Sequence, residues 1–393
     1  MAIPSPLRQT WIDLGASLLL YGPPELGVEL TETLGDIERE YAAIRKACVL
    51  MDRPDRAVVR ITGDDRIELL NRMLTQELKD VPTGSVRRSF WLNRKGRIVA
   101  DVRLLIAEDH ILVDLDAHSV GTFVESLDAF IIADDVILTD ATGDYHRLTL
   151  AGPTAADLLG EVTAGAAMPE VDHAVAATIA GAAVHIDRWD WTAAPGFELW
   201  CPADGAPAVA DALLTARVDP EAEAPSELAQ RIKLRPAGWF AMNIARVEAG
   251  TPLMHLDFTN ESLPAETGVL HDRVDFKKGC YLGQEVVARM DSLGHPKQTL
   301  AALRLTGQAM RDEDGQPRQP VGGAPILDGP ATDAKQVGAV TSSVVSPMLG
   351  AEPIALAVVR WGSHEPGKTL HVIAEGVAVE ATVQEHLAFW TPA

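Results

Sequence analysis

Between positions 57 and 139 the apolar residues switch repeatedly between alternation and a spacing of three or four, and this pattern constrains the fold most strongly. Alternation is typical of strands, and the wider spacing is typical of amphipathic helices. The order of the segments predicts a βαβββαβ unit, close to a ferredoxin-like α+β fold. The predicted strands are 57–61, 89–93, 97–106, 110–116 and 136–139, with helices around 66–74 and 120–130.

A looser copy of this alternation follows between residues 145 and 215. We expect one or two helices over residues 11–50, an exposed connection over 217–228 and a helical stretch over 228–234. From Gln298 onward, short apolar runs broken by Gly and Pro predict a small all-β barrel. The predicted domains are an N-terminal α+β domain (1–140), a middle α+β domain (141–297) and a C-terminal β-barrel domain (298–393).

Composition narrows the class of protein. The 393 residues exceed the roughly 250–300 that one hydrophobic core serves. With 34 Lys+Arg and 56 Asp+Glu, the net charge of −22 makes direct nucleic-acid binding unfavourable. No apolar stretch approaches a membrane span and no signal peptide is recognisable, so we expect a cytoplasmic protein with no membrane partner. The three widely spaced cysteines and the scattered histidines predict neither a disulfide framework nor a metal site.

The segment Lys277–Glu285, KKGCYLGQE, is the sharpest motif in the chain. Two lysines, three and two residues before Cys280, favour the thiolate form, and Gly279 and Gly283 allow close backbone approach. A loop of this kind is suited to presenting a reactive sulfur. A lone cysteine is nevertheless more often an inert, buried small side chain, so the chemistry of the segment leaves both interpretations open.

KGCYLGQE resembles the Lys-Gly-Cys-Tyr-x-Gly-Gln-Glu signature of the YgfZ-type folate-binding proteins, which are related in fold to the glycine-cleavage T-protein within the YgfZ/GcvT superfamily. The resemblance implies a ring of two ferredoxin-like α+β domains and a C-terminal β-barrel around a folate cavity. It also implies tetrahydrofolate or a derivative as the cofactor. Further segments that carry the resemblance are 40–45, 61–65, 70–72, 93–97, 195–199, 246–252, 263–266 and 337–347.

Asp101 is the first candidate site residue. Alternation along strand 97–106 places it on one face together with Arg97 and Arg103. From the residues alone, this acid belongs either to a solvated salt-bridge face or to a functional site. The resemblance places Asp101 where the T-protein keeps the acid that helps to activate its substrates. We therefore predict Asp101 and Cys280 as catalytic residues, with Asp101 also binding the cofactor.

Three further regions supply the other predicted cofactor-binding residues. Glu198 matches the T-protein glutamate that hydrogen-bonds the pterin ring, and a carboxylate suits paired N–H donors. Without the resemblance, Glu198 would be read as the exposed half of a strand. Arg246 matches a residue that lines the folate cavity, although a surface helix charge is its ordinary role. Lys278 and Tyr281 of the cysteine motif complete the predicted set.

Departures from the T-protein pattern shape the predicted function. T-protein-like sequences usually carry paired acids where this chain has Ala100-Asp101, and Met242 replaces an arginine. The resemblance therefore implies a folate-binding accessory protein for iron–sulfur cluster assembly or repair, with iron–sulfur client or assembly proteins as partners, including enzymes that modify tRNA. The alternative is a folate-dependent aminomethyltransferase or demethylase with Asp101 as the polarising acid, so enzymatic activity is left open.

Overall fold

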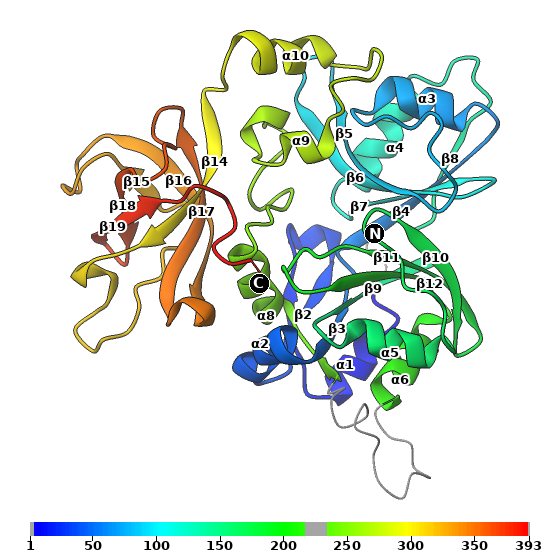
Figure 1. The fold of residues 1–393 in the computed structure, drawn as a ribbon, viewed down its shortest axis with the longest axis horizontal. Coiled ribbons are helices and arrows are strands. Elements are labelled where there is room, and N and C mark those ends of the chain that lie inside the picture. Colours follow the sequence, from blue (N-terminus) through cyan, green and yellow to red (C-terminus); the bar gives the residue numbers. More distant parts are fainter. Residues whose placement is uncertain (1–3, 217–233, 392–393) are drawn as a thin grey trace, which may run out of the picture. The chain divides into compact units, whose positions relative to one another are not determined.

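The computed structural model describes residues 4–216 and 234–391, which divide into two compact units (Figure 1). Unit 1 comprises the described residues within 1–72, 76–89 and 100–242. Unit 2 comprises those within 73–75, 90–99 and 243–393. The hairpin tip at 90–99 therefore belongs to unit 2, although it lies in the first half of the chain.

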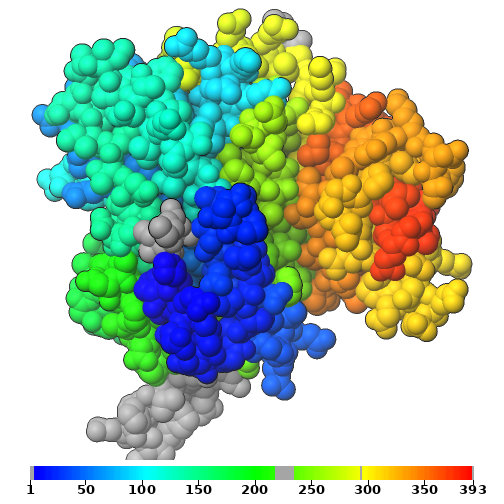
Figure 2. All heavy atoms as spheres, turned by 180° about the vertical axis from the view of Figure 1, so that it is seen from behind, coloured from blue at the N-terminus to red at the C-terminus, as the bar shows by residue number. Residues whose placement is uncertain are grey.

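The described N-terminal part of unit 1 contains two α-helices, in line with the one or two predicted over residues 11–50, but the chain between them is not helical. A strand hairpin lies between two helices because the Pro23-Pro24 pair cannot continue a helix. The first residues of this segment, coloured dark blue in Figure 2, lie on the face of unit 1 seen there, whereas its last strand is buried. Its elements are α1 (Arg8–Asp13), β1 (Ser17–Leu20), η1 (Pro24–Leu26), β2 (Glu29–Thr33), α2 (Ile37–Lys46) and β3 (Cys48–Asp52).

A five-stranded sheet follows, with strand order β5-β6-β7-β4-β8. Its chain order is the predicted βαβββαβ, which confirms this part of the α+β assignment. Helix α4 buries Phe123 and Leu127 and contacts β4 and β8. The elements are β4 (Arg56–Thr62), α3 (Arg66–Met73), β5 (Val86–Leu92), β6 (Ile98–Ile106), β7 (Ile111–Asp116), α4 (Val120–Asp128) and β8 (Ile137–Asp140).

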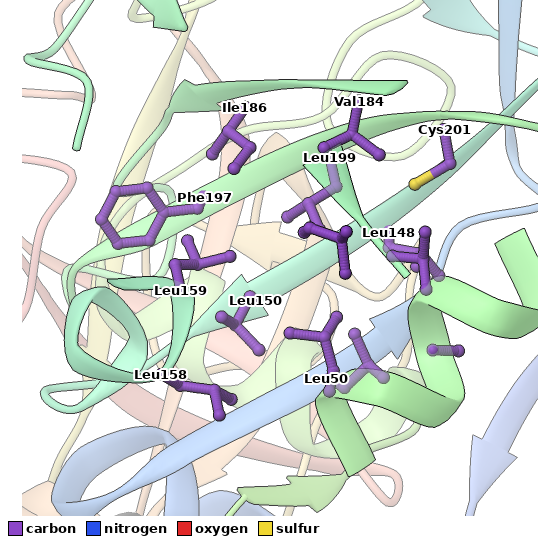
Figure 3. Packing of buried hydrophobic residues seen from close by; sticks show 14 of the residues in the cluster. Leu50, Leu148, Leu150, Leu158, Leu159, Val184, Ile186, Phe197, Leu199 and Cys201 are labelled. Carbon is purple, nitrogen blue, oxygen red and sulfur yellow. The ribbon is translucent and has the colours of Figure 1, made fainter. Parts of the chain in front are cut away.

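The second sheet of unit 1 has six strands in the order β10-β11-β12-β9-β3-β13. Helices α5 and α6 cover its apolar face, where Leu148, Leu150, Phe197 and Leu199 pack (Figure 3). The predicted helix over 228–234 is wrong at Leu234, which begins a strand, and residues 217–233 lie outside the described residues. The elements are β9 (Tyr145–Ala151), α5 (Ala155–Val162), β10 (Ala174–Ile179), β11 (Ala182–Arg188), β12 (Gly196–Pro202), α6 (Ala206–Thr215) and β13 (Leu234–Pro236).

Within unit 1 the two sheets meet through charged side chains. Successive side chains of a strand point to opposite faces of the sheet. The leucines of β9 and β12 point to the core, so the polar residues between them point to the other face. Arg147 on β9 contacts Asp114 on β7, and Arg103 on β6 forms an ion pair with Asp187 on β11. We call this set the ionic layer; it consists of Arg53, Asp55, Arg56, Arg103, Asp114, Arg147, Asp187 and Glu198.

Unit 2 contains the predicted C-terminal barrel, which is closed in the order β14-β17-β16-β15-β18-β19. Its interior is filled by small and branched apolar side chains. Helix α8 (Trp239–Glu248) enters unit 2 at Asn243. The other elements are η2 (Pro264–Glu266), α9 (Leu270–Arg273), α10 (Gln284–Leu293), β14 (Gln298–Leu305), η3 (Gln308–Met310), β15 (Pro325–Leu327), β16 (Gln336–Ser346), η4 (Pro347–Leu349), β17 (Glu352–Arg360), β18 (Thr369–Ala374) and β19 (Val377–Val383).

The mixed α+β class and the six-stranded closed barrel are thus confirmed. The division at residues 140 and 297 stays a prediction. Among the residues that the structure describes, no helix combines the length and the hydrophobicity that a membrane crossing requires.

Candidate functional site

Glu198 lies in the interior of the six-stranded sheet, on the face that carries the ionic layer. It stands directly opposite Thr149 of β9 and Asp187 of β11. Its side chain is only 2% exposed. Alternation alone suggested that Glu198 lies on the exposed face of its strand. That interpretation is wrong, because a second sheet covers this face.

A directed pair of hydrogen bonds holds one oxygen of Glu198. The hydroxyl of Thr149 donates to Oε1 of Glu198 at 2.7 Å, and Nη1 of Arg53 donates to the same hydroxyl at 3.3 Å. A guanidinium can only donate, so the Thr149 oxygen accepts from Arg53 and its single proton points to Glu198. Arg53 is itself held by two hydrogen bonds to Asp55, at 2.9 and 2.7 Å.

Arg147 faces the other oxygen of Glu198. Its Nη2 lies 3.6 Å from Oε2, which is an ion-pair distance and too long for a hydrogen bond. The same guanidinium lies 3.6 Å from Oδ1 of Asp114 and stacks over Trp200 at 3.6 Å from the ring centroid. Among the described residues, Oε2 of Glu198 therefore has an ionic neighbour but no hydrogen-bond donor.

Burial and the arginines act in opposite directions on the carboxyl groups of this layer. Burial raises the pKa of Glu198 above its ordinary value, and the charges of Arg53 and Arg147 reduce that rise. Burial raises the pKa of Asp187 in the same way. At Asp114 burial would also raise the pKa, but the charges of Arg56 and Arg147 outweigh it and lower the pKa to about 2.

Several buried donors of unit 1 have no acceptor among the described residues. Those in and beside the ionic layer are Nε and Nη1 of Arg103, Nε and Nη1 of Arg147 and the indole Nε1 of Trp191. Oδ2 of Asp187 also has no hydrogen-bond partner in the described part of the chain, so together with Oε2 of Glu198 the layer and its neighbourhood contain two carboxylate oxygens and several N–H donors. A pterin ring presents N–H donors beside carbonyl and ring-nitrogen acceptors, so the chemistry of this set fits a folate.

Asp101 lies on β6, the strand that contributes Arg103 to the ionic layer. Asp101 is half-buried on β6, two residues before Arg103, so both side chains leave the same face of the strand. Arg103 is 4% exposed and pairs with Asp187, the strand partner of Glu198. A solvated salt-bridge face is thus excluded for Arg103, and Asp101 leaves the same face of β6 as this member of the ionic layer.

Arg246 lies in unit 2 and is engaged by residues of that unit. Its Nη1 donates to Asp257 at 2.5 Å and to the Thr251 carbonyl at 3.1 Å. Its Nε donates to Asn243 at 2.9 Å and its Nη2 to Ser342 at 2.6 Å. The side chain is 1% exposed, so these contacts support an anchoring role for Arg246, and its role in folate binding stays a prediction.

The cysteine motif also lies in unit 2 and is partly structural. Lys278 is buried and donates from Nζ to the Leu74 carbonyl at 2.8 Å. Tyr281 packs in an apolar cluster with Phe90 of β5, and burial raises its pKa to about 12. Cys280 is exposed, whereas Cys48 and Cys201 are buried. The catalytic and cofactor roles predicted for this motif stay predictions.

Sequence reasoning missed the residues that surround Glu198. Arg53, Thr149, Arg147 and Asp187 were not singled out. A signal was present in the strand 145–150, where Arg147 and Thr149 alternate with leucines at 148 and 150. In residues 4–216 and 234–391, no group of three or more His, Cys, Asp and Glu side chains is placed to hold a metal ion.

The two sheets, the closed barrel and the buried acidic site define a multidomain α+β protein. The model of the GCVT N-terminal domain matches residues 21–278, and that of the glycine cleavage T-protein C-terminal barrel domain matches residues 304–389. The chain therefore belongs to the GCVT family. Members of this family use tetrahydrofolate, which agrees with the predicted cofactor.

Relatives span nearly the whole chain. It is 28% identical over 381 residues to an aminomethyltransferase of Saccharopolyspora erythraea, with 96% of each chain covered. It is 25% identical over 382 residues to one of Staphylococcus saprophyticus, again with 96% of each covered. The crystal structure of glycine cleavage system aminomethyltransferase T from Bartonella henselae has the same fold, with a TM-score of 0.81, 22% identity, and 99% and 98% of the two chains covered. These relatives support the T-protein branch and give no support to the predicted iron–sulfur role.

Proposed function

We propose that this protein is a tetrahydrofolate-dependent aminomethyltransferase. This reading reverses the order in which the sequence ranked its two candidate functions. The observation that carries it is the buried Glu198, whose Oε1 is bound by Thr149 while Oε2 has no hydrogen-bond donor among the described residues. Similarity to aminomethyltransferases over 96% of the chain supports the same reaction class.

In this proposal each acid of the ionic layer has a separate role. Glu198 accepts hydrogen bonds from the N–H edge of the pterin, because a carboxylate accepts paired donors well. Asp101, half-buried on the face of β6 that also carries Arg103, interacts with the amine of the aminomethyl donor and stabilises positive charge there. Tetrahydrofolate, when bound, supplies the nitrogen that receives the one-carbon unit. The orphaned donors of Arg103 and Trp191 are available to pterin acceptors.

The test combines folate binding with turnover. The purified full-length protein is mixed with tetrahydrofolate and aminomethyl donors, and methylene-tetrahydrofolate is measured. Asp101→Asn should lower turnover by about 100-fold or more while folate affinity changes little, because the acid acts on charge that develops in the reaction. Glu198→Gln should weaken folate binding by about tenfold, the typical value for a lost charged hydrogen bond.

Glu125→Gln is the matched control, since Glu125 is exposed on α4 of the same unit. Absence of turnover with every donor, together with folate affinity that is the same for wild type and Glu198→Gln, would exclude the proposal.

A second candidate is the accessory role in iron–sulfur cluster maintenance, which rests on the exposed thiol of Cys280. Three cysteines cannot supply the four thiolates that usually hold a cluster, so a partner or small thiol would have to share it. Under this reading Cys280→Ala lowers iron–sulfur enzyme activities in oxidatively stressed cells. Unchanged activities would remove the candidate.

A further inference from the structure

We propose that Thr149, oriented by Arg53, is a positioning residue that keeps Glu198 an acceptor on one oxygen and leaves the other oxygen for the ligand. The inference rests on the proposed function, in which Glu198 binds the pterin. It adds two residues to that site and predicts how folate binding depends on pH. Neither residue is a catalytic group, because both act through Glu198.

The first step is the direction of the hydrogen bonds. A free hydroxyl rotates and can either donate to a carboxyl oxygen or accept from a protonated one. Arg53 favours the first of these, because its Nη1 donates to the Thr149 oxygen at 3.3 Å and its positive charge favours an ionised Glu198. Thr149 then donates its proton to Oε1 at 2.7 Å, so Oε1 is held as an acceptor.

The second step is the rigidity of this arrangement. Arg53 is fixed by its paired bonds to Asp55, and its side chain is 2% exposed. Thr149 is fully buried and lies directly opposite Glu198 in the ladder between β9 and β12. The β-branched threonine has a restricted χ1 angle in a strand, so the hydroxyl position is set by the backbone.

The third step is the charge of Glu198. Burial raises its pKa, so the neutral acid is favoured more than at the surface. The charged groups that face it are Arg53 beyond β3, Arg147 on β9, Arg103 on β6 and Asp187 on β11. The three arginines favour the carboxylate and Asp187 opposes it. A donated hydrogen bond also favours the ionised form, so Thr149 acts together with the arginines.

Thr149→Val is the informative change, because valine keeps the shape and β-branching of threonine and removes only the hydroxyl. Thr149→Ser, which keeps the hydroxyl, is the matched control. Arg147 is unsuitable for this purpose, since it also contacts Asp114 and Asp187 and its loss would disturb the whole layer. Thermal unfolding checks that both variants fold.

The experiment measures the affinity for 5-formyltetrahydrofolate, a stable reduced folate, by calorimetry between pH 6 and 9. Thr149→Val should bind about tenfold more weakly than wild type at pH 6, and the deficit should shrink as rising pH ionises Glu198. Thr149→Ser should stay within about twofold of wild type. A Thr149→Val variant that binds like wild type at every pH, or one whose deficit does not change with pH, would overturn the proposal.

A readout without ligand separates this inference from the proposed function. The carboxyl of Glu198 is titrated by infrared spectroscopy as the difference between each background and the same background with Glu198→Gln. Thr149→Val should move this titration to higher pH and Thr149→Ser should not. If wild type bound no folate but the titration moved, the proposed function would fail and the positioning role would stand. An unmoved titration would overturn the positioning role whatever the affinity for folate.

Discussion

At the scale of single residues, Asp114 shows how the ionic layer contributes to stability. Arg56 donates to it through Nε at 3.1 Å and Nη2 at 2.9 Å, and Arg147 lies 3.6 Å away. Its pKa is lowered to about 2 in the folded protein. A depressed carboxyl pKa contributes stability that is present above the unfolded value, near 3.8, and is lost as the pH falls toward 2.

Asp114→Asn should therefore lower the free energy of unfolding by about 3 kcal/mol at neutral pH, because it leaves a buried arginine without its counter-charge. The difference from wild type should shrink by about 2 kcal/mol as the pH falls from 5 toward 2, where the wild-type acid is itself protonated. Urea denaturation followed by circular dichroism measures both quantities. Asp211→Asn, exposed on α6, is the control, and a difference that is independent of pH would contradict this account.

Substitution of Arg246 can show whether this residue stabilises the fold of unit 2 or serves only to bind the ligand. Its contacts join α8 to Asp257 and to Ser342 of the barrel, all within unit 2. Arg246→Ala should lower the free energy of unfolding by about 3–5 kcal/mol without folate, because it leaves the buried carboxylate of Asp257 without its counter-charge. Arg246→Lys should recover only part of this loss, since an ammonium group cannot reproduce the planar fork.

The measurement is urea denaturation of the full-length protein without ligand, with Arg289→Ala, exposed on α10, as the control. A residue that serves only the folate would leave the stability of the free protein unchanged.

The ionic layer could not be predicted from the sequence one residue at a time. Alternation correctly placed Ile98, Ala100 and Val102 on one face of β6, and all three are buried. It could not reveal that the opposite face is covered as well, because that depends on the packing of a sheet formed more than 40 residues later. Buried arginines such as Arg103 and Arg147 look like surface charges until the acids that pair with them are known.

At the scale of elements, the different spacings of apolar residues in strands and in helices were enough to predict the order β4-α3-β5-β6-β7-α4-β8. They failed where short apolar runs are ambiguous. Leu18-Leu19-Leu20 fits a helix or a strand equally well, and the hairpin partner β2 decides for the strand. Leu234 joins the sheet as β13 only because β3 offers it a parallel partner, beginning at Cys48.

The loop that leads into α10 gives a prediction about the glycines of the cysteine motif. Gly283 has φ +82°, and a Cβ there would lie 2.7 Å from the Asn93 carbonyl oxygen of the hairpin tip in unit 2. Gly283→Ala should lower the free energy of unfolding by about 2 kcal/mol, through left-handed strain and this clash. At Gly279 nothing lies within 4 Å of an added Cβ, so Gly279→Ala should change it by less than about 0.5 kcal/mol.

Chemical denaturation of the two variants side by side makes the comparison. Equal stabilities would show that the close approach of the motif to the hairpin tip is not tight in solution.

At the scale of the whole molecule, the reactivity of the three cysteines can be used to distinguish the two candidate functions. Cys48 and Cys201 lie in the core of unit 1, and burial raises the pKa of Cys201 to about 12, while Cys280 is exposed in unit 2. A thiol reagent should therefore label one cysteine rapidly in the folded protein and all three after unfolding, because the buried thiols are not accessible to the reagent. Fast labelling of a second thiol in the folded protein would contradict the packing of this core.

The same thiol then separates the two candidate functions. If the protein transfers aminomethyl groups through the acids of the ionic layer, alkylation of Cys280 or Cys280→Ala should change kcat and KM by less than about twofold, since surface substitutions away from a site cost little. Asp101→Asn in the same assay should abolish most of the turnover and leave the thiol as reactive as before. The opposite outcome has two parts: the purified protein transfers no one-carbon unit, and iron–sulfur enzyme activities in cells require a free Cys280 thiol. That outcome would assign the function to the cysteine motif in unit 2.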